Sequence, residues 1–218
     1  MATTKDIREA VRAELDFDPL VDAADITVKN MTGDVALNGT VPNYPQYLEA
    51  AAAARRVAGV TSVHNHLEVV LPAGQYRDNA MLTTAANNAL MANITVPDGV
   101  EATASDGNIW LTGTVSHGSE RTAAESAVAG LIGVRGIRDD IEIRGNAEIT
   151  ADVTDLVQGA LDRYSLIADD SDITVSGTDG PVTLAGHVRT WAEHDAVIDA
   201  AWMGAGVSAV RDDLFVTG

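Results

Sequence analysis

The chain carries one sequence pattern three times, and this repetition limits its fold more than any other feature. Three similar segments begin at offsets of 74 and then 73 residues: ITVKNMTGDVALNGTV from Ile26, VEATASDGNIWLTGTV from Val100 and ITVSGTDGPVTLAGHV from Ile173. A second block follows each of them at the same offsets: GVTSVHNHLEV from Gly59, GVRGIRDDIEI from Gly133 and GVSAVRDDLFV from Gly206. Because both blocks keep their register, we interpret the chain as three copies of one structural unit.

Each unit is predicted to contain five elements in the same order. Apolar residues at helical spacing come first, and in the first copy these are Ile7, Ala10, Val11 and Leu15. Two segments of alternating polarity then flank a glycine turn, which predicts a β-hairpin. A second apolar pattern at helical spacing follows, and a strand over the second block closes the unit.

The order helix, strand, strand, helix, strand indicates an α+β fold. A right-handed crossover through the second helix makes the second and third strands parallel and places both helices on one face of the sheet. We therefore expect three tandem αββαβ domains, each a three-stranded mixed sheet with two helices on one face, over residues 1–72, 77–145 and 148–218. Repeated glycines are predicted to serve the backbone at turns and helix ends: Gly39, Gly59, Gly113, Gly133, Gly186 and Gly206.

The composition excludes several classes of protein. The chain has no cysteine, which excludes disulfides, thiolate metal ligands and cysteine nucleophiles. Its formal net charge is −18 and its cations are not clustered, so nucleic-acid binding is not expected and direct binding to anionic lipid is disfavoured. No apolar run is long enough to span a membrane, and the charged start MATTKDIREA is unlike a signal peptide. We expect a cytoplasmic protein, or a periplasmic one if this is a processed form.

The recurring motifs resemble those of the BON domain family, named for bacterial OsmY and nodulation proteins. The motifs are the glycine after the apolar pair of the second strand, in VALNGTV, IWLTGTV and VTLAGHV, and the later GV-x-x-V-x-[ND]-x-[LI] block. The resemblance extends over nearly the whole chain. It implies an αββαβ fold, no catalytic residues, and roles in osmotic or envelope stress through binding of membranes or other macromolecules. One branch of the family is cytoplasmic and binds potassium.

Two groups of side chains have the spacing of metal ligands. His64 and His66 face the same side of a predicted strand, but the other copies have an arginine and an aspartate there, so we interpret the pair as part of a solvated strand face. Asp169, Asp170 and Asp172 crowd one loop, where oxygen ligands could hold a hard cation. Solvated aspartates that cap turns are the alternative. No spacing assembles a nucleophile and a base, so neither an enzyme activity nor a cofactor is expected.

Two tryptophans are the candidates for contact with a partner or with another repeat. Trp110 lies between Ile109 and Leu111 on a predicted strand, so its side chain faces away from the helices of its own unit. Trp202 lies beside the apolar stripe of its helix and not within it. Aromatic side chains outside a core usually mark a contact surface. A neighbouring repeat and an external partner both stay open as the contact.

The function we predict from these features is that of a non-enzymatic binding protein, associated with osmotic or general stress, that contacts an unidentified macromolecule or membrane component. The alternative is a cytoplasmic cation sensor for potassium or calcium, in which acidic loops bind an ion and reorient the repeats. The charge distribution bears on this alternative, because residues 1–76, 77–146 and 147–218 carry net charges of −4, −4 and −10.

Overall fold

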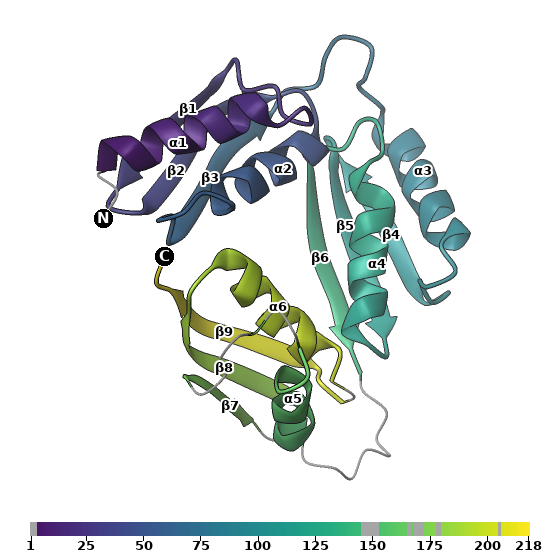
Figure 1. Cartoon of the computed structure of the whole chain (residues 1–218). Helices are drawn as coiled ribbons and strands as arrows, with labels where there is room; N and C mark the ends of the chain where they lie inside the picture. Colours follow the sequence, from purple (N-terminus) through teal and green to yellow (C-terminus); the bar gives the residue numbers. More distant parts are fainter. Residues whose placement is uncertain (1–3, 145–152, 165–166, 168–171, 178–179, 205) are drawn as a thin grey trace.

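The fold consists of three small units in tandem. The computed structural model of the chain describes residues 4–144, 153–164, 167, 172–177, 180–204 and 206–218. Within these residues the chain forms three separate three-stranded sheets, each accompanied by two helices (Figure 1). This architecture confirms the predicted array of three α+β units.

The elements follow one another in the same order in every repeat. The first repeat consists of α1 (Thr4–Phe17), β1 (Ile26–Met31), β2 (Asp34–Val41), α2 (Tyr44–Arg55) and β3 (Ser62–Val69). The second consists of α3 (Asn79–Ala92), β4 (Val100–Ser105), β5 (Asn108–Val115), α4 (Gly118–Ala129) and β6 (Gly136–Ile143). The third consists of α5 (Val153–Leu161), β7 (Ile173–Gly177), β8 (Pro181–Val188), α6 (Trp191–Trp202) and β9 (Ala209–Val216).

Each sheet combines antiparallel and parallel pairing. β1 and β2 are antiparallel whereas β2 and β3 are parallel, and the other two sheets repeat this arrangement. The hairpin turn of the first repeat has two residues, Thr32 and Gly33, with φ of 61° and 96°. Both therefore adopt the left-handed conformation that a type I′ turn requires. The helix between the second and third strands supplies the crossover that makes them parallel.

Alternation along the strands gives each repeat a core of its own. Val35 and Leu37 of β2 are fully buried and pack with Val11 and Leu15 of α1, because residues two apart on a strand face the same side of the sheet. The equivalent buried pairs are Ile109 with Leu111 and Val182 with Leu184. Each core is small, as is usual for a domain of about 70 residues.

A polar side chain caps the start of two of the second helices, α2 and α6. The Asn43 side chain accepts a hydrogen bond from the backbone N–H of Gln46 at 3.0 Å, and the Thr190 hydroxyl accepts one from Glu193 at 3.1 Å. Glu193 in turn accepts the backbone N–H of Arg189, the residue before Thr190, at 2.7 Å. These caps fix the direction in which the chain enters the helix.

The three repeats lie around a common centre and not in a line (Figure 1). The third strand of each sheet (β3, β6 and β9) lies toward the other repeats, and the first strand (β1, β4 and β7) lies on the outside. The end of β9 returns to the side of the first repeat (Figure 1), where Gly218 lies beside Gly59. In the described parts of the chain, no helix has both the length and the apolar character needed to cross a membrane.

Candidate functional site

A polar side chain on the third strand is connected to the second helix in every repeat. The two partners are 18 residues apart each time: Tyr47 and Asn65, Arg121 and Asp139, His194 and Asp212. Asn65 donates from Nδ2 to the carbonyl oxygen of Tyr47 at 2.7 Å, and Arg121 forms a salt bridge with Asp139. We call this recurring contact the helix–strand bridge. It holds the crossover helix against the edge of the sheet that lies toward the other repeats.

In the third repeat the helix–strand bridge contains a titratable histidine. His194 is nearly buried, with Nε2 at 2.9 Å from a carboxylate oxygen of Asp212 and Nδ1 at 3.0 Å from one of Asp195. Desolvation by burial lowers the pKa of His194, but the hydrogen bonds with Asp195 and Asp212 and the charges of both carboxylates together outweigh it, so the pKa is raised overall. The imidazole is therefore held as a cation more readily than a free histidine.

We expect the stability of the third repeat to fall as pH rises through the folded-state pKa of His194. Because that pKa is raised above its ordinary value of about 6.5, the contribution of the protonated ring is complete below about pH 6.5 and is lost above the folded-state pKa. Urea denaturation from about pH 5 to 8.5, followed by tryptophan fluorescence, measures this dependence. His194→Gln should remove it and Asp212→Asn should reduce it, and an unchanged pH profile in His194→Gln would contradict the assignment.

Trp202, at the end of α6, lies between the second and third repeats. It packs against the buried cores of both repeats, and the Arg121 guanidinium lies 5.9 Å from its ring centre. A Cβ atom at Gly118, at the start of α4, would lie only 2.8 Å from Cε3 of the indole. The absence of a side chain at Gly118 is therefore what allows the ring to approach the helix.

Trp110 occupies the outer face of its sheet. It is half-buried, and its neighbours across the sheet are Thr103 and Arg138 of its own repeat. The flanking residues Ile109 and Leu111 are fully buried on the other face, so the strand has the alternation that the sequence predicts. The role of Trp110 in a contact with a partner stays a prediction.

His64 and His66 are both exposed on β3. Their rings stack with centroids 6.2 Å apart, and His64 Nε2 lies 3.0 Å from an Asp34 oxygen. The equivalent positions in the second repeat hold a salt bridge of 2.9 Å between Arg138 and Asp140. These two strand positions therefore carry charged or polar side chains on the solvent side in both repeats.

The acidic loop of the third repeat is only partly described. Asp169 and Asp170 lie outside the described residues, and Asp172 is exposed. Among the residues that are described, no group of three His, Cys, Asp or Glu side chains is arranged to hold a metal ion. Cation binding at this loop stays a prediction.

The six glycines predicted to serve the backbone lie where the chain turns or strands approach closely. Their φ angles are all positive: Gly39 130°, Gly59 84°, Gly113 133°, Gly133 101°, Gly186 139° and Gly206 90°. Gly39, Gly113 and Gly186 occupy equivalent positions on the second strands.

The first and second repeats meet around Tyr44. This side chain packs against the cores of both repeats. Burial, followed by the nearby Tyr47 and Glu125, raises the pKa of the Tyr44 hydroxyl. Arg135 adds a second contact, because its Nε donates to the carbonyl oxygen of Val69 at 3.1 Å.

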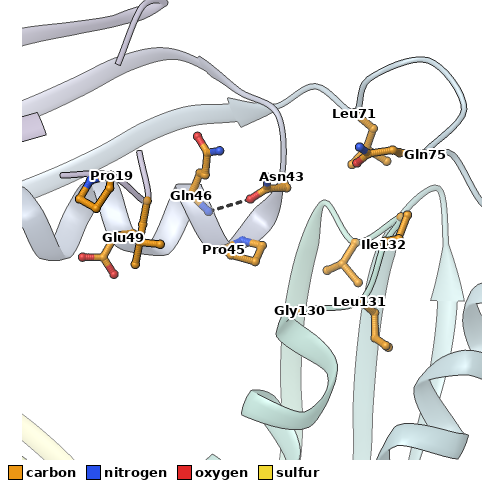
Figure 2. A pocket seen from close by; sticks show the side chains of 13 residues that line it. Pro19, Asn43, Pro45, Gln46, Glu49, Leu71, Gln75, Gly130, Leu131 and Ile132 are labelled. Carbon is orange, nitrogen blue, oxygen red and sulfur yellow. Dashed lines mark hydrogen bonds between the residues drawn. The ribbon is translucent and has the colours of Figure 1, made fainter. Parts of the chain in front are cut away.

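A pocket of about 470 Å³ lies beside this contact (Figure 2). Pro19, Asn43 and Glu49 line it from the first repeat, and Leu131 and Ile132 line it from the second. Two of the polar side chains there already have partners: Asn43 caps α2 and Glu49 binds Arg56 at 2.8 Å. The pocket therefore has a mixed lining, in which apolar side chains from both repeats lie beside polar ones.

An exposed apolar pair recurs at the C-terminal ends of the first helices. Phe17 and Leu20 are 81% and 65% exposed, and Met91, 84% exposed, and Ile94 occupy the same two positions in the second repeat. The described residues leave most of the surface of these four side chains uncovered. Water-exposed apolar side chains that are grouped in this way usually belong to a binding surface.

Comparison with known proteins agrees with the division of the chain into three repeats. The chain is 31% identical over 143 residues to osmotically-inducible protein Y of Escherichia coli (strain K12), which covers 63% of this chain and 71% of the relative. A structural protein of the type III secretion system of Chlamydia trachomatis matches 94% of this chain and 90% of its own, with 15% identity and a TM-score of 0.26. The BON domain matches residues 3–70, 78–145 and 149–218. The chain therefore belongs to the BON domain family, of which it contains three tandem copies.

Proposed function

We propose that this protein is a non-enzymatic binding protein of the osmotic stress response, which contacts a macromolecule or a membrane component through the apolar pairs at the ends of α1 and α3. The similarity to osmotically-inducible protein Y supports the association with osmotic stress. The observation that carries the binding role is the repetition of the exposed pair, Phe17 with Leu20 and Met91 with Ile94.

The fold itself does not require these side chains to be exposed. In the third repeat the equivalent residues, Tyr164 and Ile167, pack against the core of their own domain. The first two repeats instead leave large apolar groups in water, which is unfavourable unless a partner covers them. Because the chain has a net charge of −18, the partner surface that suits it is apolar and neutral or basic, and not anionic.

Replacing all four exposed side chains with serine tests this function. Phe17→Ser, Leu20→Ser, Met91→Ser and Ile94→Ser are combined in one variant, and binding is measured to vesicles of zwitterionic phosphatidylcholine and, separately, to a chemically unfolded polypeptide. We expect the affinity for at least one of them to fall by tenfold or more, since each buried apolar side chain contributes about 1.5–3 kcal/mol. The target whose binding falls, vesicles or unfolded polypeptide, identifies the class of partner.

A matched variant controls for the loss of exposed apolar surface. Met31→Ser and Phe215→Ser remove side chains that are 79% and 65% exposed but lie away from the ends of the first helices. This variant should bind as the unmodified protein does. Equal binding by all three proteins, or no binding to either target, would refute the proposed function.

A further inference from the structure

The second helices of the three repeats meet head to tail. At one contact, Gly118 at the N-terminal end of α4 faces Trp202 at the C-terminal end of α6. At another, Trp191 at the N-terminal end of α6 lies under Arg55 at the C-terminal end of α2, with the guanidinium carbon 4.6 Å from the ring centre. Tyr44, which contacts the second repeat, is the N-terminal residue of α2. Each repeat therefore uses the start of its second helix to contact the next repeat.

The third strands make contacts in the same rotational sense. Arg135, just before β6, binds the carbonyl oxygen of Val69 at the end of β3. Gly218, just after β9, lies beside the segment before β3, where a Cβ atom on it would be 3.4 Å from the Cα atom of Gly59. The end of one third strand thus meets the start of the next one at both places.

Head-to-tail contacts of this kind form a closed ring when the rotation between successive units returns to the start. Here the third repeat returns to the first, as the position of the chain end in Figure 1 shows. We propose that the joint between the third and first repeats is a reversible latch, formed by Trp191 and Arg55, that closes the chain into a ring and closes more tightly as ionic strength rises.

The latch is the weakest of the three joints for structural reasons. The chain itself connects the first repeat to the second and the second to the third, whereas the third and first are brought together without such a link. The indole N–H of Trp191 is buried and, among the described residues, meets no acceptor. Burial of an unpaired donor is unfavourable and opposes closure, whereas the cation–π contact with Arg55 favours it.

The charges of the two repeats make the latch sensitive to salt. Residues 147–218 carry a net charge of −10 and residues 1–76 carry −4, so the two repeats repel each other. The screening length falls from about 30 Å at 0.01 M salt to about 8 Å at 0.15 M. Added salt therefore weakens the repulsion across the whole joint, while the short contact between Arg55 and Trp191 is screened much less.

Closure can be measured by disulfide formation, because the chain has no cysteine of its own. Thr61→Cys and Gly218→Cys place two thiols across the joint, where a Cβ atom on Gly218 would lie 3.6 Å from Cγ2 of Thr61. A γ atom of residue 61 therefore lies close to the β-carbon of residue 218, so a small adjustment of the two side chains brings the thiols within reach of a disulfide. Gly74→Cys with Gly218→Cys is the matched control, since Gly74 lies in the connection between the first two repeats and a Cβ there would meet no atom within 4 Å.

We expect the Thr61–Gly218 cysteine pair to oxidise much faster than the control pair in a fixed redox buffer. Arg55→Gln should slow it about fivefold, in keeping with the loss of one cation–π contact, whereas Arg138→Gln, which removes the same charge from the second repeat, should not. Trp191→Ala should also slow it. Equal rates for the two cysteine pairs, or no effect of Arg55→Gln, would overturn the latch.

Salt tests the second part of the proposal. We compare the rate of disulfide formation in the Thr61→Cys, Gly218→Cys variant with that in the control variant. The ratio of the two rates should rise between about 0.01 and 0.15 M salt, equally in KCl and NaCl. A ratio that falls or stays constant would overturn the dependence on ionic strength, and a rise with potassium alone would replace it with specific ion binding. The result is independent of the four exposed side chains at the ends of α1 and α3, so either proposal can fail without the other.

Discussion

Gly39→Ala is expected to unfold the first repeat at room temperature. Gly39 has a φ of 130°, a conformation that costs an alanine about 1–3 kcal/mol. A Cβ atom there would also lie 1.9 Å from the carbonyl oxygen of Asp25, so β1 would have to move away from β2. We expect a total loss of at least about 4 kcal/mol, which places the change among the most severe single substitutions.

Urea denaturation of the full chain, followed by circular dichroism, measures this loss. The unfolding curve of Gly39→Ala should lose the contribution of one repeat and keep that of the other two. Gly74→Ala is the control, because Gly74 also has a positive φ, 88°, but has open space around it, and it should cost about 1 kcal/mol. If the two variants were equally stable, the close approach of β1 to β2 would not be a constraint on the fold.

Trp202→Ala should produce the second largest effect, a loss of about 3 kcal/mol. The indole packs against the cores of both the second and third repeats, so its removal leaves a cavity that neither repeat can fill alone. It also removes the ring that lies near the Arg121 guanidinium. We expect the two repeats to unfold in separate steps in the variant.

Trp110→Ala provides the matched comparison. Trp110 is half-buried on the outer face of its sheet, where a cross-strand neighbour contributes about 0.2–1 kcal/mol. Both variants are compared by urea denaturation with detection by circular dichroism, because each removes a fluorophore. If Trp110→Ala were as destabilising as Trp202→Ala, the outer face of the second sheet would be covered by another part of the chain.

The repeat pattern was sufficient to predict the fold of each unit. The alternation around Val35 and Leu37 and the helical spacing of Val11 and Leu15 correctly identify buried positions. Ala10 belongs to the same helical pattern, but it is exposed. A small apolar residue at a helical position next to the stripe carries too little information to place it, because alanine is favourable in helices on any face.

The contacts within and between repeats were harder to predict. The sequence shows no motif around His194, yet the repeat alignment places it where the other copies have Tyr47 and Arg121, and all three are 18 residues from the polar residue that they contact. Comparison of both positions across the copies would have found the helix–strand bridge. The joints between repeats depend on orientation in space, which no local pattern in the sequence specifies.

The head-to-tail contacts have a consequence for how such a protein can evolve. A ring made from three identical chains would have the same side chains at all of its joints, so a mutation would change every joint at once. In this chain the position of Trp202 is taken by Arg55 in the first repeat and by Ala129 in the second. Because the three copies lie in one chain, their joints carry different side chains, and a mutation can strengthen one joint and leave another adjustable.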